Sequence, residues 1–210
     1  HQTLTPISNL KIYGKILSET NHENQEEIDT ILEQTEKLDF LIQSLVKLSR
    51  MESGIIAVHS EDTTIKQMLE SIQQQFNVKV REKNITLSLC DTDLHVRCDS
   101  KWTVEALGNI VDNAIKYTAC GGNVQIKVEQ YSFFVKIDII DDGIGIEKEE
   151  IPKIFGRFYR SLSVADQPGV GIGLFLARKI IQAQKGYIKV TSKRGKGSTF
   201  SVFLPIAKKE

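Results

Sequence analysis

The stretch Glu105-Ala-Leu-Gly-Asn-Ile-Val-Asp-Asn-Ala-Ile-Lys-Tyr117 has the pattern of a helix with two different faces. Its apolar residues recur at helical spacing and form one face: Leu107, Ile110, Val111, Ala114 and Ile115. Asn109, Asn113 and Tyr117 recur four residues apart on the opposite face, with Lys116 beside them. Such spacing predicts a helix that packs on a core with one side and presents polar groups on the other.

The asparagines of this helix have two interpretations. Asn in the middle of a helix costs roughly 0.5 kcal/mol or more relative to Ala, and a simple solvated face would be served better by Glu or Lys. Asn carbonyl oxygens are also hard, neutral ligands that suit Mg²⁺, an ion that bridges to phosphates. Lys116 would then provide a cation for phosphate oxygens, and Tyr117 a flat face. This helix alone leaves both interpretations open.

The residues around this helix alternate between strand patterns and helix patterns. The strand patterns are residues 55–58, 85–89, 94–98, 124–128, 133–140, 187–191 and 199–204. The helix patterns are residues 62–83, 100–117 and 174–184. Interleaved helices and hairpin-like strand pairs predict an α/β sandwich of the α+β class, in which a mixed sheet carries helices on one face.

Residues 1–53 have a different periodicity, which predicts a hairpin of two helices. The first helix contains Ile7, Leu10, Gly14 and Leu17, and ends in the polar residues 18–24. The second has a heptad seam of Ile28, Ile31, Thr35, Leu38, Ile42, Leu45 and Ser49. The break at Ser53-Gly54 predicts two domains, residues 1–53 and 54–210.

The apolar stripe of the hairpin is wider than one seam, because Leu32, Leu41, Val46 and Leu48 extend it. Two helices cannot bury such a stripe against each other, whereas a four-helix bundle made by two chains can. We therefore expect a homodimer. The alternative is a hairpin packed on the rest of its own chain.

The composition argues against several classes of protein. Lys+Arg and Asp+Glu are both 27, so the zero net charge gives no reason to expect binding to nucleic acid or a membrane surface. No apolar run approaches the roughly 18 residues of a membrane span. The three cysteines are odd in number and lack CxxC spacing, which favours reduced thiols over a zinc site.

Three glycine-rich segments follow the central helix. Asp141-Asp-Gly143-Ile-Gly145-Ile146 comes directly after a strand, where a carboxylate can accept a hydrogen bond from an exocyclic amine such as that of adenine. Residues 169–174 open a helix whose free N–H groups suit phosphates, although the segment follows a loop rather than the strand of a dinucleotide fold. Residues 195–200 join the last two strands and have the pattern of a hairpin turn.

An aromatic segment at residues 154–160 lies between the first two glycine segments. Phe155 and Phe158 could anchor the base of a loop, and Arg160 could reach phosphates. This pattern is compatible with a lid that closes over a nucleotide. It is also compatible with a surface loop held by a small aromatic cluster.

In this order, the motifs resemble the catalytic core of sensor histidine kinases. The nucleotide domain of these kinases belongs to the GHKL superfamily, shared with type II topoisomerases, heat-shock chaperones and mismatch-repair ATPases. Residues 109–117 resemble the N box, 141–146 the first glycine box, 155–160 the F box, 169–174 the second glycine box and 195–200 the final glycine turn. The resemblance extends over essentially the whole chain.

The resemblance implies that the chain binds ATP and Mg²⁺. Asn113 would hold the metal, with Asn109 and Lys116 near the phosphates. Asp141 would bind the adenine amine, with Tyr117 and Ile146 lining the base pocket. The further nucleotide-binding residues implied are Gly143, Gly145, Arg160, Gly169, Gly171, Gly173 and Leu174.

The residue at position 109 favours a kinase within this superfamily. In hydrolysing relatives, a Glu one turn before the metal-binding Asn activates water. Asn109 stands there and cannot take a proton, and Glu105 is a further turn away. The γ-phosphoryl group is then better delivered to a protein nucleophile. An ATP-hydrolysing enzyme stays the alternative.

The first seven residues, His1-Gln-Thr-Leu-Thr5-Pro6-Ile7, resemble the phosphoacceptor motif of the family. His1 would accept the phosphoryl group and pass it to an aspartate of a response-regulator receiver domain, and Thr5 would orient water in the reverse phosphatase reaction. Gln2 replaces the acidic residue common in the motif, so a degenerate kinase that acts as a phosphatase or dimeric scaffold is a further alternative.

The chain begins at His1 without a preceding Met, so we read it as a fragment. We expect its first turn to be poorly ordered and its autokinase activity to be weak, because a helix that starts at the acceptor frays. The family resemblance implies a cytoplasmic portion of a membrane-anchored bacterial sensor. We expect no contact of this portion with the membrane itself.

Overall fold

The computed structural model describes residues 10, 12–17, 25–53, 58–161, 164, 167 and 169–207. The chain divides into two compact units, His1–Ala57 with Asp166–Val170, and Val58–Ala165 with Gly171–Glu210. The domain boundary after residue 53 stays a prediction.

The first unit contains the long helix α2, Gln25–Glu52, and a shorter helical segment at residues 12–17. The two helices pack closely at Gly14, where an added Cβ atom would lie 2.7 Å from Leu32 Cδ2. A helical hairpin is therefore present, as predicted. Ile7 and the turn at residues 18–24 lie outside the described residues.

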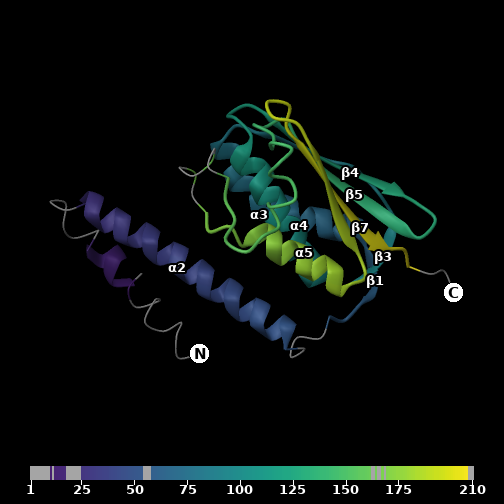
Figure 1. Cartoon of the computed structure of the whole chain (residues 1–210), viewed down its shortest axis with the longest axis horizontal. Coiled ribbons are helices and arrows are strands. Elements are labelled where there is room, and N and C mark those ends of the chain that lie inside the picture. Colours follow the sequence, from purple (N-terminus) through teal and green to yellow (C-terminus); the bar gives the residue numbers. More distant parts are fainter. Residues whose placement is uncertain are drawn as a thin grey trace. The chain divides into compact units, whose positions relative to one another are not determined.

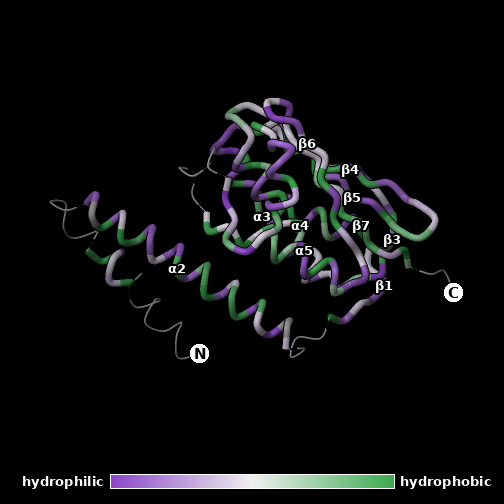
Figure 2. The backbone as a smooth tube through the Cα atoms, viewed as in Figure 1, coloured by the Kyte–Doolittle hydropathy of each residue, from purple (hydrophilic) through white to green (hydrophobic). Residues whose placement is uncertain are grey.

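The heptad seam of α2 is buried in part only. Ile28 and Thr35 are buried, whereas Ile31, Leu38 and Leu45 are 53%, 46% and 41% exposed. Figure 2 shows hydrophobic and hydrophilic residues alternating along α2. Within one chain, the hairpin leaves much of its apolar seam uncovered.

The second unit is built on a five-stranded sheet with the strand order β2-β4-β5-β7-β6. The strands are β2 (Thr86–Leu89), β4 (Asn123–Gln130), β5 (Phe134–Asp141), β6 (Tyr187–Ser192) and β7 (Ser198–Pro205). β2 is parallel to β4, and the other neighbouring strands are antiparallel. This arrangement confirms the predicted mixed sheet.

A second, two-stranded sheet corrects the expectation for the start of this unit. We expected a strand at residues 55–58 and a helix from residue 62. Instead, β1 (Glu61–Thr64) pairs antiparallel with β3 (His95–Cys98), and helix α3 begins only at Ile65. Thr63 and Thr64 are β-branched and suit a strand, but the partner that makes the ladder lies more than thirty residues away in sequence. Val58 is not in a strand, and residues 55–57 lie outside the described residues.

Three helices cover one face of the large sheet (Figure 1). They are α3 (Ile65–Glu82), α4 (Ser100–Tyr117) and α5 (Gly173–Ala183). Fully buried side chains of all three meet those of the sheet and form the core: Ile65, Met68, Ile72, Leu107, Ile110, Ile180, Ile181, Ile126, Ile137 and Ile139. Each such side chain stabilises the fold by roughly 1.5–3 kcal/mol.

The central helix α4 has the bounds that its sequence predicted. It begins after Asp99, whose side chain accepts a hydrogen bond from Trp102 N at 3.2 Å, a standard N-cap. Its apolar face is buried, which leaves the asparagine face for other contacts. Among the described residues, no helix is long and apolar enough to cross a membrane.

Candidate functional site

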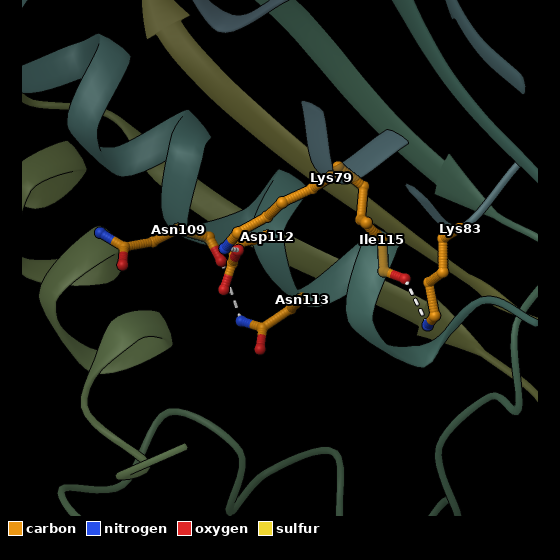
Figure 3. A network of polar contacts seen from close by, with 6 residues as sticks. All are labelled: Lys79, Lys83, Asn109, Asp112, Asn113 and Ile115. Carbon is orange, nitrogen blue, oxygen red and sulfur yellow. Dashed lines mark hydrogen bonds and ion pairs between the residues drawn. The ribbon is translucent and has the colours of Figure 1, made fainter. Parts of the chain in front are cut away.

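The two asparagines of α4 hold their amide groups in the same way. Asn109 Nδ2 donates to Glu105 O, and Asn113 Nδ2 donates to Asn109 O, both at 2.9 Å. Figure 3 shows these side chains along one side of the helix. Within the described residues, no donor bonds to either Oδ1 atom, so each carbonyl oxygen is available to a ligand. These hydrogen bonds also fix which end of each amide is the oxygen.

The start of α5 lies directly opposite Asn109. An added Cβ atom on Gly173 would lie 3.0 Å from Asn109 Oδ1, closer than nearly all real contacts of this kind. Leu174 follows in the first turn of α5, where backbone N–H groups have no partner within the helix. The second glycine segment therefore brings a helix N-terminus to the asparagine face, and such a terminus favours anions.

Gly171 joins this segment to the aromatic segment. It has φ +76°, and an added Cβ atom would lie 2.7 Å from Tyr159 O. Phe158, which also has a positive φ, donates its N–H to Gly171 O at 2.9 Å. Only glycine fits at residue 171 without strain. Gly169 also has a positive φ, but it clusters with the helical unit.

Asp141 ends β5 as a buried carboxylate, with 7% of its surface exposed. Its Oδ1 accepts hydrogen bonds from Gly143 N at 3.0 Å and Ser198 N at 3.2 Å. Burial raises the pKa of Asp141, and these two hydrogen bonds oppose the rise. Among the described residues, none donates to Oδ2, so this oxygen can accept from a ligand.

The turn after Asp141 is held between the end of α4 and the β6–β7 turn. Ile144 N donates to Tyr117 O at 3.3 Å, and Gly195 N donates to Ile144 O at 2.8 Å. A Cβ atom on Gly143 would lie 2.5 Å from Tyr117 O. One on Gly145, at φ +66°, would collide with the backbone of Lys193. The glycines are therefore required by close backbone approach.

The charges of Lys116 and Arg160 interact at the end of α4. Burial lowers the pKa of Lys116, and the nearby charge of Arg160 lowers it further. Arg160 also counteracts the burial that raises the pKa of Tyr117. Lys116 Nζ lies 4.8 Å from the centre of the Tyr117 ring, and Arg160 Nη2 donates to Val164 O at 2.9 Å. Like charges that interact in this way favour an anionic ligand nearby.

The structure thus brings most of the predicted nucleotide-binding residues together around α4. Ile146 joins them through its N–H, which donates to Ser192 Oγ at 2.8 Å. Ser192 Oγ also donates to Gly197 O at 2.8 Å and lies 2.9 Å from Ser198 Oγ. His1, Gln2 and Thr5 lie outside the described residues.

Sequence reasoning missed the residues that hydrogen-bond the segments on which the site residues lie. Ser192 is one of these residues. Asp142 accepts hydrogen bonds from Asn123 N at 2.9 Å and Asn123 Nδ2 at 2.8 Å, which lower its pKa and fix the glycine turn to β4. Lys83 is another, since its ammonium group bonds the end of α4. Nothing in the local sequence marks these contacts, because each partner comes from a distant segment.

The donor set fits Mg²⁺ bound through a nucleotide better than a resident metal centre. No group of three or more His, Cys, Asp or Glu side chains able to hold a metal occurs in the described residues. Asn113 offers one neutral oxygen, which is enough for a Mg²⁺ ion that keeps its waters and is held mainly by phosphates.

Two protein-family models match the chain. The family of histidine kinase-, DNA gyrase B- and HSP90-like ATPases matches residues 98–208. The His Kinase A (phospho-acceptor) domain matches residues 1–54.

Curated relatives and solved structures agree with these matches. The sensor histidine kinase WalK of Bacillus subtilis is 32% identical over 214 residues, which cover 98% of this chain and 35% of WalK. The chain therefore spans about a third of that relative. Full-length ShkA in complex with AMPPNP has a TM-score of 0.82 at 20% identity, over all of this chain and 45% of ShkA. The histidine kinase ThkA in complex with the response regulator TrrA has a TM-score of 0.72 at 22% identity, over 97% of this chain and 57% of ThkA.

The two family matches follow each other in the order of the two predicted domains, and the larger covers more than half of the chain. The chain belongs to the family of histidine kinase-, DNA gyrase B- and HSP90-like ATPases, and with its preceding His Kinase A domain it is the catalytic core of a sensor histidine kinase.

Proposed function

We propose that this core binds Mg-ATP, transfers the γ-phosphoryl group to His1, and then passes it to an aspartate of a response-regulator receiver domain. The observation that carries this proposal is the meeting of three kinds of group around α4. These are the buried carboxylate of Asp141, the available Asn109 and Asn113 oxygens, and the cations Lys116 and Arg160. The carboxylate suits the adenine base, the asparagine oxygens suit the metal ion, and the cations suit the phosphates.

Each group has a role in this proposal. Asp141 Oδ2 accepts the adenine amine, and Tyr117 and Ile146 line the base pocket. Asn113 coordinates Mg²⁺, while Asn109, Lys116 and Arg160 contact phosphate oxygens. The further glycines and Leu174 shape the backbone that surrounds the nucleotide: Gly143, Gly145, Gly169, Gly171, Gly173.

Position 109 supports phosphoryl transfer to protein over hydrolysis. The Asn109 amide cannot accept a proton from water, and its Nδ2 is engaged with Glu105 O. A neutral imidazole nitrogen of His1 would attack the γ-phosphorus in line. The new N–P bond forms as the bond to the ADP oxygen breaks, and the imidazole loses its proton to solvent or to a neighbouring base.

The helical unit supports a homodimer. Its seam residues Ile31, Leu38 and Leu45 are about half exposed within one chain, and a second hairpin would cover them. The complex of ThkA with its response regulator TrrA supports a receiver domain as partner. By family, we place this core on the cytoplasmic side of a membrane-anchored sensor.

Incubation with γ-labelled ATP and Mg²⁺ tests the activity. We expect acid-labile, base-stable label on the wild-type protein and none on His1→Gln, while both bind ATP. Label retained by His1→Gln would contradict the assignment of the acceptor. Steady phosphate release without labelled protein would indicate an ATP-hydrolysing enzyme instead.

Gln2 gives a second candidate, since it replaces an acidic residue that commonly assists the histidine. A core without that base could serve as a phosphatase or a dimeric scaffold. Gln2→Glu is then expected to raise the rate of label incorporation. A phosphatase would also dephosphorylate its phosphorylated receiver domain in a manner that depends on Thr5.

A further inference from the structure

The carbonyl groups of residues 114–118, at the end of α4, are all bonded, although the C-cap of this helix is Thr118 and not a glycine. Ala114 O accepts from Thr118 N at 3.1 Å, and Tyr117 O accepts from Ile144 N at 3.3 Å. The remaining three carbonyls, those of Ile115, Lys116 and Thr118, all accept from one group. That group is the ammonium of Lys83.

Lys83 bonds these carbonyls at 2.9, 2.7 and 2.7 Å, respectively. A lysine ammonium has three N–H donors, so its capacity is used completely. Figure 3 shows the side chain reaching from the end of α3 to the Ile115 carbonyl. The positive charge also lies at the negative end of the helix dipole, where it stabilises the last turn.

The backbone of Lys83 is fixed independently of its side chain. It is the C-cap of α3, its N–H donates to Lys79 O at 3.2 Å, and its carbonyl accepts from Gly121 N at 3.1 Å. A variant that loses only the ammonium therefore keeps the connection of α3 to the α4–β4 turn. The effect of the three charged hydrogen bonds can be isolated.

The turn that Lys83 holds carries one side of the candidate base pocket, Tyr117, and the phosphate-side cation Lys116. Tyr117 and Lys116 belong to this turn, and Tyr117 O accepts from the turn that follows Asp141. We propose that Lys83 is a positioning residue, which fixes the last turn of α4 and thereby the Tyr117–Ile144 contact that closes the base pocket. Its role for nucleotide rests on the proposed function.

Lys79 provides a matched control. It lies one turn earlier in α3 and also reaches α4, where its Nζ is 2.6 Å from Asp112 Oδ1. Both side chains of this ion pair are exposed by about half, at 59% and 44%. Such a surface pair contributes little. It also bonds no backbone group of the last turn.

Amide hydrogen exchange of the protein without nucleotide tests the positioning role directly. In Lys83→Met, we expect exchange of the Ile144 and Thr118 amides to accelerate by about tenfold or more, because charged hydrogen bonds to three carbonyls in a partly buried position are lost. Lys79→Met should leave both rates unchanged, and Lys83→Arg should recover part of the protection. Unchanged protection in Lys83→Met would overturn the inference, whatever the protein binds.

Titration with Mg-ADP then connects this role to the site. At a temperature where circular dichroism shows all variants folded, Lys83→Met should bind about tenfold more weakly than wild type, and Lys79→Met as tightly as wild type. Lost protection with unchanged affinity would also overturn the role. If the wild-type protein itself failed to bind, the proposed function would be wrong, while the exchange rates would still decide whether Lys83 positions the turn.

Discussion

The side-chain oxygen of Asn109 faces Gly173 so closely that a Cβ atom there would lie 3.0 Å away. A methyl group at this position must displace Asn109 or the start of α5 by a few tenths of an ångström. We expect Gly173→Ala to weaken Mg-ADP binding by about tenfold, because small displacements of positioning groups are costly. Its Tm should not fall, since Ala is a better helix residue than Gly.

Gly108→Ala is the control for this prediction. It makes the same change in α4, on the side that faces α3, where a Cβ atom would lie at an ordinary 3.6 Å from Gln75. Calorimetric titration should give the wild-type affinity for Gly108→Ala. Equal affinities of the two variants would show that the Asn109–Gly173 approach does not matter for nucleotide.

Asp141→Asn distinguishes the roles of the two oxygens of the buried carboxylate. The Asn carbonyl can keep the hydrogen bonds from Gly143 N and Ser198 N, while its amide nitrogen replaces the oxygen that would accept the adenine amine. Binding of Mg-ADP should weaken by about tenfold or more, because two donors then face each other.

The raised pKa of Asp141 also predicts a dependence on pH. The folded state holds this proton more tightly than the unfolded state, so the contribution of Asp141 to stability decreases as pH rises from its ordinary pKa through its raised one. Asp141→Asn should therefore be at least as stable as wild type in urea at pH 7, although it binds nucleotide less well. The free energy of unfolding of Asp141→Asn, relative to that of wild type, should rise from the acid end of this range to pH 7. A fall in this difference would contradict the raised pKa.

Substitutions of Asn109 test whether the lack of a general base explains why we expect little hydrolysis of ATP. Asn109→Glu places a possible base one turn before Asn113, whereas Asn109→Gln has the same size and no base. We expect Asn109→Glu to release phosphate about tenfold or more faster than Asn109→Gln, because a positioned base accelerates proton transfer. Equal rates in a coupled phosphate-release assay would mean that the lack of a base does not account for the preference for phosphoryl transfer to protein over hydrolysis.

The sequence predicted α4 well because both of its faces carry a signal. Its apolar residues recur with the helical period. Asn109 and Asn113, which are poor helix formers, both lie on the opposite face. The Asp141 turn could also be predicted, since Gly143 and Gly145 are conspicuous directly after an apolar strand. Local pattern and tertiary role coincide at these residues.

The missed features depend on partners that are distant in sequence. β1 exists because His95 and its neighbours pair with Thr64 and the residues before it, and the isolated segment favours neither strand nor helix strongly. Likewise, Lys83 and Ser192 are ordinary residues in their own segments. Their contacts appear only when α3 meets α4 and when β6 meets the Asp141 turn.

The exposed seam of α2 predicts how the proposed homodimer can be broken. Leu38 is 46% exposed within one chain, so Leu38→Glu should cost the single hairpin little. In a four-helix bundle the same charge would be buried without a partner, at a cost that favours monomers. Sedimentation equilibrium should show a dimer for wild type and for Gln43→Glu, which adds the same charge at an exposed polar position outside the apolar stripe. If Leu38→Glu stayed dimeric at the same concentration, the seam would not be the dimer interface.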